Sequence, residues 1–165
     1  MSADFAPYVF DVAEQIGIDP YMLWSMMQQE SQGKNTAKSK KGAMGLMQLM
    51  PRTYNSVALG SEGQLQPYSD RTDPYNSLLA GGLYYKQMLK QKGTPKKALI
   101  AYNAGPNTKK PNNKETNEYI KNVMNTYRMG KAYERLLQGE QQGQQYMDTA
   151  VRGNPNPLAS ILGAQ

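Results

Sequence analysis

Apolar residues recur along this chain at the spacing of three and four positions that is typical of an α-helix. In residues 4–17 they fall on one helical face, and Asp4 is the expected N-cap of that helix. The apolar positions of this face are Phe5, Val9, Val12, Ala13 and Ile16. No segment alternates convincingly between apolar and polar residues, so the sequence predicts an all-α fold.

Aspartate or threonine followed by proline marks the start of three further helices. The first residue caps free backbone N–H groups, and proline fits the first helical turn. The helices are expected to begin at Asp19-Pro20, Asp73-Pro74 and Thr94-Pro95 and to end at Gly33, Gly93 and Gly105-Pro106. A last long helix is predicted from Glu115 to Leu137, and loops are predicted over residues 33–50 and 60–72.

The C-terminal segment differs in composition from the helical part. Residues 138–145 form a polar stretch of Gln, Gly and Glu, and residues 154–157 repeat Asn-Pro before a short apolar patch at 158–162. We therefore expect one domain over residues 1–137 and a tail over residues 138–165. The tail reads either as a frayed terminus or as a peptide that docks the domain onto a larger assembly.

The composition excludes several kinds of chemistry. The chain has no Cys and no His, which rules out disulfides, Cys-ligated zinc, and Ser-His-Asp or Cys-His catalysis. Proton transfer in an enzyme of this sequence falls to Asp, Glu, Lys or Tyr. The net charge of +6 favours an anionic partner, but the short lysine clusters carry no nucleic-acid-binding signature, so no nucleic-acid specificity is expected. No apolar stretch is long enough to span a bilayer, and the first residues do not read as an export signal.

Glu30 is the carboxyl group whose position suggests chemistry. It follows Leu23 and Met27 on the inward stripe of its predicted helix, in the last turn before Gly33. Partial burial and the negative end of the helix dipole both disfavour the ionised form, so we expect a raised pKa for Glu30. A carboxylic acid that stays protonated near neutral pH can protonate the leaving oxygen of a glycoside.

Two later segments supply groups that suit a sugar ligand. Gly42 and Gly45 leave little side-chain bulk in a loop, so the backbone can approach a ligand closely, while Ser39 and Gln48 offer a hydroxyl and an amide. The same loop ends in an apolar wall at Met47, Leu49 and Met50, and Pro51 is well placed to open the next helix. Downstream, the segment 101–106 ends a helix with the hydroxyl of Tyr102 and the amide of Asn103.

Taken together and in this order, these segments resemble the soluble lytic transglycosylase family. The matching motifs are Glu-Ser-x-Gly at 30–33, Gly-Ala-x-Gly-Leu-Met-Gln-Leu-Met-Pro at 42–51 and Ala-Tyr-Asn-Ala-Gly-Pro at 101–106. Glu-Thr-x-x-Tyr at 115–119 resembles a fourth, looser signature, and the similarity covers roughly residues 8–137. The resemblance implies a lysozyme-like α fold of the goose type, with a groove across which a peptidoglycan glycan strand lies.

The resemblance also implies roles for individual residues. Glu30 matches the catalytic acid/base of the family. The positions that match substrate-binding residues are Ser39, Gln48, Met50, Tyr102, Asn103, Glu115 and Tyr119. No metal and no cofactor is implied.

The implied reaction is cleavage of the β-1,4 bond between N-acetylmuramic acid and N-acetylglucosamine, which leaves a 1,6-anhydro end. Ordinary glycosidases use two carboxylates, whereas the motifs around Glu30 contain no second one, so a single carboxyl group is expected to act as acid and then as base. Two alternatives stay open. One is a hydrolytic lysozyme on the same scaffold, and the other is a structural or glycan-binding protein that has kept the fold.

The missing export signal, the small size and the tail lead us to expect a bacteriophage virion protein that opens the wall during genome delivery. Its expected partners are the glycan strand and, through the tail, the virion tail or ejection proteins. The alternative location is the bacterial periplasm.

Overall fold

The computed structural model describes residues 5–153 of the chain, without the side chains of residue 143 and residues 146–153. Six helices lie in this part of the chain: α1 (Ala6–Ile16), α2 (Pro20–Ser31), α3 (Pro51–Leu59), α4 (Pro74–Lys92), α5 (Pro95–Ala104) and α6 (Lys114–Gly153). Extended pairing within the described residues is limited to two isolated antiparallel bridges, Lys38 with Met44 and Met44 with Leu49. The predicted all-α fold is confirmed.

Three of the predicted helix starts are confirmed by their N-caps. The carboxylate of Asp19 accepts hydrogen bonds from the backbone N–H groups of Tyr21 (2.8 Å) and Met22 (3.3 Å). The side chains of Asp73 and Thr94 accept from backbone N–H groups three residues further on in the same way. Each of these caps stands directly before a proline in the first turn, as the sequence pattern requires.

In the first two helices, one predicted start and one predicted end differ from the structure. α1 has Phe5 as its N-cap, whose side chain has no atom that can accept a capping hydrogen bond, and Pro7 lies in its first turn; Asp4 lies outside the described residues. α2 ends one residue earlier than expected, since Gln32 itself adopts the left-handed conformation (φ 55°) that we assigned to Gly33. Gly33 follows with a positive φ of its own (74°), so two left-handed residues in succession turn the chain out of the helix.

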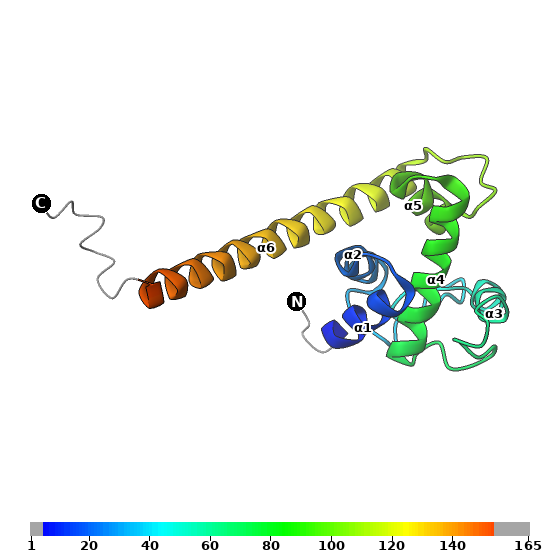
Figure 1. Ribbon diagram of the computed structural model, residues 1–165. Helices are drawn as coiled ribbons and strands as arrows, with labels where there is room; N and C mark the ends of the chain where they lie inside the picture. The colour runs from blue at the N-terminus through cyan, green and yellow to red at the C-terminus, as the bar shows by residue number, and fades with distance from the viewer. Residues whose placement is uncertain (1–4, 154–165) are drawn as a thin grey trace, which may run out of the picture. The chain divides into compact units, whose positions relative to one another are not determined.

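α4 is the central element of the domain. It packs against α1, α2, α3 and α5, and Figure 1 shows it in green between α1 and α2 on one side and α3 on the other. A methyl group on Gly81 would collide with the side chain of Met47, so the missing side chain lets the loop that follows α2 lie directly on α4. The hydrophobic core therefore reaches from the helices into this loop, where Leu46 and Met47 are fully buried.

The loop over residues 33–50 is ordered by hydrogen bonds to its carbonyl groups. Arg71 donates through Nη1 to the carbonyls of Gly42 (3.1 Å) and Leu49 (2.8 Å). Gly45 has a φ of +82°, and a side chain there would run into the carbonyl of Arg71. The loop is thus held against the segment that precedes α4, in one defined conformation.

The chain divides into two units, residues 1–127 and 128–165. Within the first unit, α6 contributes Tyr119, Ile120 and Val123 to the core. The predicted helix end at Leu137 is wrong, because the helix continues to Gly153 through the stretch at 138–145, whose Gln and Glu residues favour helix. The predicted boundary between a domain over 1–137 and a tail over 138–165 stays a prediction.

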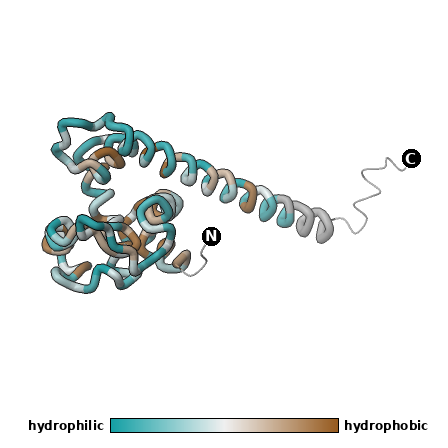
Figure 2. The backbone as a smooth tube through the Cα atoms, turned by 180° about the vertical axis from the view of Figure 1, so that it is seen from behind, coloured by the Kyte–Doolittle hydropathy of each residue, from teal (hydrophilic) through white to brown (hydrophobic). Residues whose placement is uncertain are grey.

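The second unit carries apolar side chains that are open to solvent. Met129, Tyr133, Leu136 and Leu137 are exposed, at the three- and four-residue spacing of a single helical face. In Figure 2 the colour along α6 accordingly changes between hydrophobic and hydrophilic from turn to turn. Within the residues that the structure describes, no helix is long and apolar enough to cross a membrane.

Candidate active site

Glu30, in the last turn of α2, is the centre of a small group of tyrosines. Burial raises the pKa of Glu30 from its ordinary value of 4.5 to about 7, and the nearby hydroxyl of Tyr119 acts in the opposite direction and lowers that pKa. The direction agrees with the expectation from the sequence. No other carboxyl group contributes to the shift, so Glu30 stands without an acidic partner among the described residues.

Tyr119 reaches Glu30 from α6. Its side chain is only 5% exposed, and its hydroxyl faces the Glu30 carboxyl without a hydrogen bond of normal geometry to any described residue. Burial, followed by the charge of Glu30, raises the pKa of the Tyr119 hydroxyl well above its ordinary value of 10. The hydroxyl therefore keeps its proton and can donate it in a hydrogen bond when Glu30 is ionised.

Tyr102 approaches Glu30 from α5, and the charge of Glu30 adds to the burial that raises the pKa of its hydroxyl. This hydroxyl donates a hydrogen bond to the backbone carbonyl of Met47, at 2.9 Å. The ring lies against that of Tyr84, with 5.1 Å between centroids and an angle of 47° between the planes. Tyr102 thus joins α5 to the loop before α3, and its hydroxyl is already engaged by the protein.

Asn103 is linked to the start of α6. Its side-chain oxygen accepts a hydrogen bond from the hydroxyl of Thr116, at 3.0 Å, and Thr116 is itself buried. The backbone N–H of Thr116 donates to the side chain of Asn113, at 2.8 Å, which caps α6. This pair of contacts fixes the helical turn that carries Tyr119 relative to the end of α5.

The loop before α3 presents a second set of polar groups. Gln48 adopts a left-handed conformation (φ 48°), which its side-chain amide stabilises by donating to the carbonyls of Ala37 (3.0 Å) and Gly45 (2.9 Å). The hydroxyl of Ser39 accepts from the backbone N–H of Ala43, at 3.0 Å. Met50, the N-cap of α3, is 41% exposed.

Comparison with known proteins assigns the family. Residues 7–125, most of the chain, match the model of the transglycosylase SLT domain. The chain belongs to the transglycosylase SLT domain family. Its fold is accordingly the lysozyme-like fold of lytic transglycosylases, as the sequence motifs predicted.

Relatives of this SLT domain come from a phage and from bacteria. It is 33% identical over 93 residues to a transglycosylase of Enterobacteria phage PRD1, covering 56% of this chain and 32% of the relative. It is 32% identical over 102 residues to membrane-bound lytic murein transglycosylase F of Stutzerimonas stutzeri, covering 58% of this chain and 19% of the relative. The chain thus spans less than a third of the length of these relatives.

Two solved structures resemble this SLT domain. The first is an inactive Glu-to-Gln mutant of the lytic transglycosylase Slt of Pseudomonas aeruginosa, with 27% identity and a TM-score of 0.65 over 73% of this chain and 22% of that one. The second is the 70 kDa soluble lytic transglycosylase of Escherichia coli, with 27% identity and a TM-score of 0.64 over 78% of this chain and 24% of that one.

The structure brings some of the predicted site residues of this SLT domain into direct proximity. Glu30, Tyr102 and Tyr119 interact with one another, and Asn103 joins them through Thr116. The side-chain contacts of Ser39 and Gln48 stay within their own loop, which reaches the tyrosine group at Met47. Glu115 is exposed in the first turn of α6. The functional assignment of all these residues stays a prediction.

Sequence reasoning missed three residues that shape the site. Arg71 holds the loop, Tyr84 packs on Tyr102, and Thr116 fixes the start of α6. Thr116 lies inside the Glu-Thr-x-x-Tyr motif and could have been found there. Arg71 and Tyr84 act through contacts between distant segments and leave no local signal.

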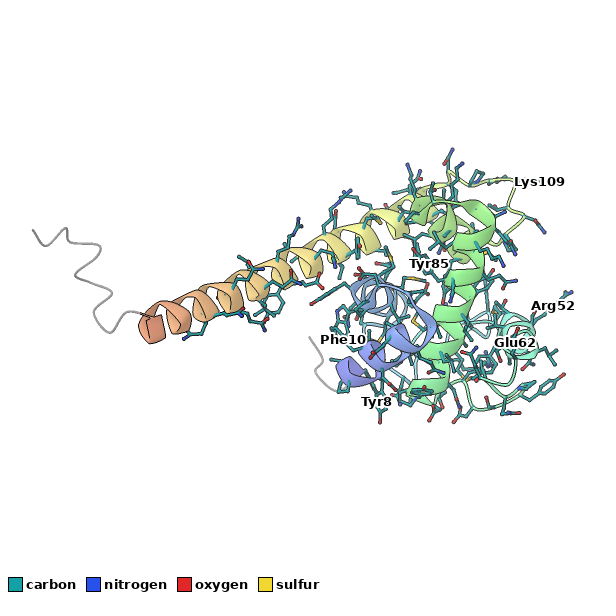
Figure 3. All side chains as sticks on the ribbon, in the orientation of Figure 1. Tyr8, Phe10, Arg52, Glu62, Tyr85 and Lys109 are labelled. Atoms are coloured by element: carbon teal, nitrogen blue, oxygen red, sulfur yellow. The ribbon has the colours of Figure 1, made fainter. Side chains whose placement is uncertain are left out.

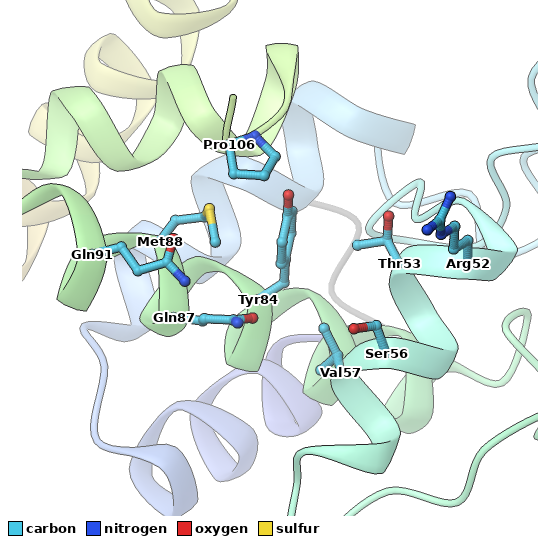
Figure 4. A pocket seen from close by; sticks show the side chains of 9 residues that line it. All are labelled: Arg52, Thr53, Ser56, Val57, Tyr84, Gln87, Met88, Gln91 and Pro106. Carbon is cyan, nitrogen blue, oxygen red and sulfur yellow. The ribbon is translucent and has the colours of Figure 1, made fainter. Parts of the chain in front are cut away.

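A pocket opens beside Tyr84, between α3 and α4 (Figure 4). Its volume is about 260 Å³. It is lined by Arg52, Thr53, Ser56, Val57, Tyr84, Gln87, Met88, Gln91 and Pro106. The pocket adjoins the candidate active site through the ring contact between Tyr84 and Tyr102.

Proposed function

We propose that this SLT domain is a peptidoglycan lytic transglycosylase in which Glu30 acts first as an acid and then as a base. The observation that carries this proposal is the pKa of about 7 at Glu30, which no second carboxyl group accompanies. A group that must lose and regain one proton works best when its pKa lies near the ambient pH. The names of the relatives and the inactivity of the Glu-to-Gln mutant from Pseudomonas aeruginosa support the assignment.

The proposed reaction needs no water. The carboxylic acid of Glu30 gives its proton to the glycosidic oxygen, and the bond from that oxygen to C1 of the muramoyl sugar breaks. The N-acetyl carbonyl of this sugar stabilises the positive charge at C1. The C6 hydroxyl of the same sugar then attacks C1 and returns its proton to Glu30, so the nucleophile gains the advantage of intramolecular proximity. The hydroxyl of Tyr119 donates to the Glu30 carboxylate between the two steps.

We assign the remaining predicted residues to the binding of the strand. The loop before α3 provides Ser39, Gln48 and Met50, and α5 provides Tyr102 and Asn103. The first turn of α6 provides Glu115. The amide nitrogen of Gln48 holds the loop, which leaves its oxygen as the atom to accept a hydrogen bond from the substrate. Tyr102 contributes its ring and the position of the loop rather than a free hydroxyl.

The experiment that tests the proposal is digestion of purified peptidoglycan by the wild type and by Glu30→Gln. The wild type is expected to release anhydromuropeptides, and the variant to lose roughly 10²–10⁴-fold in rate while still binding the wall. Glu14→Gln, at an exposed position of α1, is the matched control and is expected to keep full activity. Unchanged wall breakdown by Glu30→Gln would refute the role of Glu30.

The mass of the product separates this function from its alternatives. An anhydro end is one water lighter than the reducing end left by a hydrolytic lysozyme. Exclusive release of the heavier product would therefore mean hydrolysis. A glycan-binding protein without catalytic function would release neither product.

We propose further that the protein is carried in a bacteriophage virion and opens the wall during genome delivery, docked to tail or ejection proteins through residues 138–165. Similarity to a phage transglycosylase supports this context, as do the exposed apolar side chains at Met129, Tyr133, Leu136 and Leu137, next to the proposed docking segment. Residues 154–165 of that segment lie outside the described part of the chain. Mass spectrometry of purified virions tests the location, and detection in the periplasm alone would contradict it.

A further inference from the structure

We propose that the pocket between α3 and α4 is a subsite for a carboxylate carried by the muramoyl sugar, and that Arg52 is the residue that selects for it. This inference rests on the proposed function. Two residues of the pocket wall, Arg52 and Thr53, directly follow the loop that ends in Met50 and Pro51. A third, Pro106, is the last residue of the motif that contains Tyr102 and Asn103. The pocket is therefore built from the same two segments that we assign to strand binding.

The chemistry of the lining fits one part of a glycopeptide. Figure 4 shows the ring of Tyr84 standing in the middle of the pocket, with Thr53 and Ser56 of α3 on one side and Gln87 of α4 on the other. Hydroxyls and amides can bind sugar hydroxyls or peptide groups, and a tyrosine ring can cover an apolar sugar face. The volume of about 260 Å³ lies below the roughly 300–1,000 Å³ of pockets that take a whole ligand, so it suits a substituent rather than a separate molecule.

Arg52 is the one charged residue among those that line this pocket. Its side chain is exposed, and Figure 3 shows it extending outward from α3. No described residue forms an ion pair with it. A guanidinium binds a carboxylate through two parallel hydrogen bonds, so an unpaired arginine at the mouth of a neutral pocket favours an anionic substituent.

Two carboxylates of peptidoglycan fit this description. A stem peptide brings its own carboxylates, and a muramoyl sugar without a peptide carries the carboxylate of its lactyl group. Three soluble glycan substrates separate these sources from each other and from a neutral ligand: strands with stem peptides, the same strands with their carboxylates converted to amides, and strands from which an amidase has removed the peptides.

The test compares Arg52→Gln with the wild type on these three substrates. We expect kcat/KM on peptide-bearing strands to fall by up to about fivefold, the upper end of the range for an exposed ion pair, and to stay unchanged on amidated strands. Arg52→Lys keeps the charge but not the paired hydrogen bonds, so its kcat/KM on peptide-bearing strands is expected to lie between those of the wild type and Arg52→Gln. Lys96→Gln removes an exposed cation from the first turn of α5 and is expected to behave as the wild type on every substrate.

The stripped strands identify the source of the carboxylate. A loss on peptide-bearing strands alone assigns the stem peptide. A loss on stripped strands alone assigns the lactyl group, because its carboxyl is bound in an amide as long as the peptide is attached. A loss on both means that Arg52 binds either carboxylate. An equal loss on native and amidated strands, or no loss on any of the three substrates, would overturn the proposal. Binding of the native and amidated strands is measured beside cleavage. If the wild type releases no anhydro product, the proposed function fails, while the binding data still decide the role of Arg52.

Discussion

A carboxyl group held away from water must be protonated before it can serve as an acid, and its pKa decides at which pH that form is present. In Glu30 burial has raised the pKa to about 7, while Tyr102 and Tyr119 supply neutral hydroxyl-bearing neighbours rather than charges. The site therefore holds both protonation states of Glu30 at comparable populations near neutral pH. The single-carboxylate mechanism depends on this balance.

The first prediction at the residue scale concerns the pH dependence of cleavage. Because the acid form of Glu30 starts the reaction, we expect kcat/KM to fall as the pH rises through about 7. Tyr119 lowers the pKa of Glu30, so Tyr119→Phe should move this alkaline limb to higher pH. Initial rates on soluble strands between pH 5 and 9 measure both effects. A limb that stays in place in Tyr119→Phe would show that this hydroxyl does not interact with Glu30.

The second prediction concerns stability. The pKa of Glu30 is higher in the folded chain than its ordinary value of 4.5, so the folded state favours the protonated form. Glu30 therefore costs no stability below pH 4.5, and its penalty grows until the pH passes about 7. Glu30→Gln should raise the free energy of unfolding by roughly 2–3 kcal/mol at pH 8 and by little at pH 4.

Chemical denaturation at pH 4 and pH 8 provides the measurement. Glu14→Gln, on the exposed side of α1, is expected to leave the unfolding free energy unchanged at both values. A variant Glu30→Gln that is less stable than the wild type at pH 8 would mean that the ionised carboxylate has partners that compensate for its burial.

Glu30 could be predicted from the sequence because the helical spacing places it on the same face as Leu23 and Met27, which are both fully buried. It could not predict that the hydroxyl of Tyr102 donates to the carbonyl of Met47, because that bond joins residues 55 positions apart. Motifs record which side chains occur together, whereas the direction in which a hydroxyl points depends on packing between elements.

At the scale of elements, local chemistry explains why most helix starts could be predicted. A cap such as Asp19 binds N–H groups two and three residues away, so it can be recognised from neighbouring positions in the sequence. The C-terminal ends of the helices were harder to predict from the sequence. Both Gln32 and Gly33 are left-handed, and the preference of glycine for this conformation pointed to Gly33 alone. The extension of α6 to Gly153 was missed because a Gln-rich stretch has the composition of a low-complexity segment, although its Gln and Glu residues favour helix.

The loop over residues 33–50 carries the prediction at this scale. Gly45→Ala would place a methyl group against the carbonyl of Arg71, in a left-handed conformation, so we expect a loss of several kcal/mol in stability, above the roughly 1–2 kcal/mol of the conformation alone. Gly42→Ala is the matched control, because Gly42 is also left-handed (φ 90°) but faces open space. Gly42→Ala should lose only the roughly 1–2 kcal/mol of stability that the left-handed conformation costs.

Thermal unfolding of the two variants, with cleavage assayed at a temperature where both are folded, gives the comparison. Equal destabilisation by Gly45→Ala and Gly42→Ala would show that the contact between this loop and Arg71 does not fix its conformation.

At the scale of the molecule, the family match and the compact unit nearly coincide. The SLT domain matches residues 7–125, and the first unit ends at Tyr127. Every residue of the candidate active site and of the pocket beside Tyr84 belongs to this unit. The exposed apolar residues from Met129 to Leu137 and the tail belong to the other. Catalysis and docking are therefore expected to be separable by truncation.

A chain that ends at Leu137 is thus expected to keep the thermal stability and the cleavage rate of the full chain. A chain that ends at Asn113 lacks Tyr119, Ile120 and Val123, whose burial contributes several kcal/mol, and it should not fold, because a domain has only about 5–15 kcal/mol in total. Circular dichroism melts and release of anhydromuropeptides measure both properties. Loss of activity in the chain ending at Leu137, with its fold intact, would mean that residues 138–165 take part in catalysis and that the predicted boundary is misplaced.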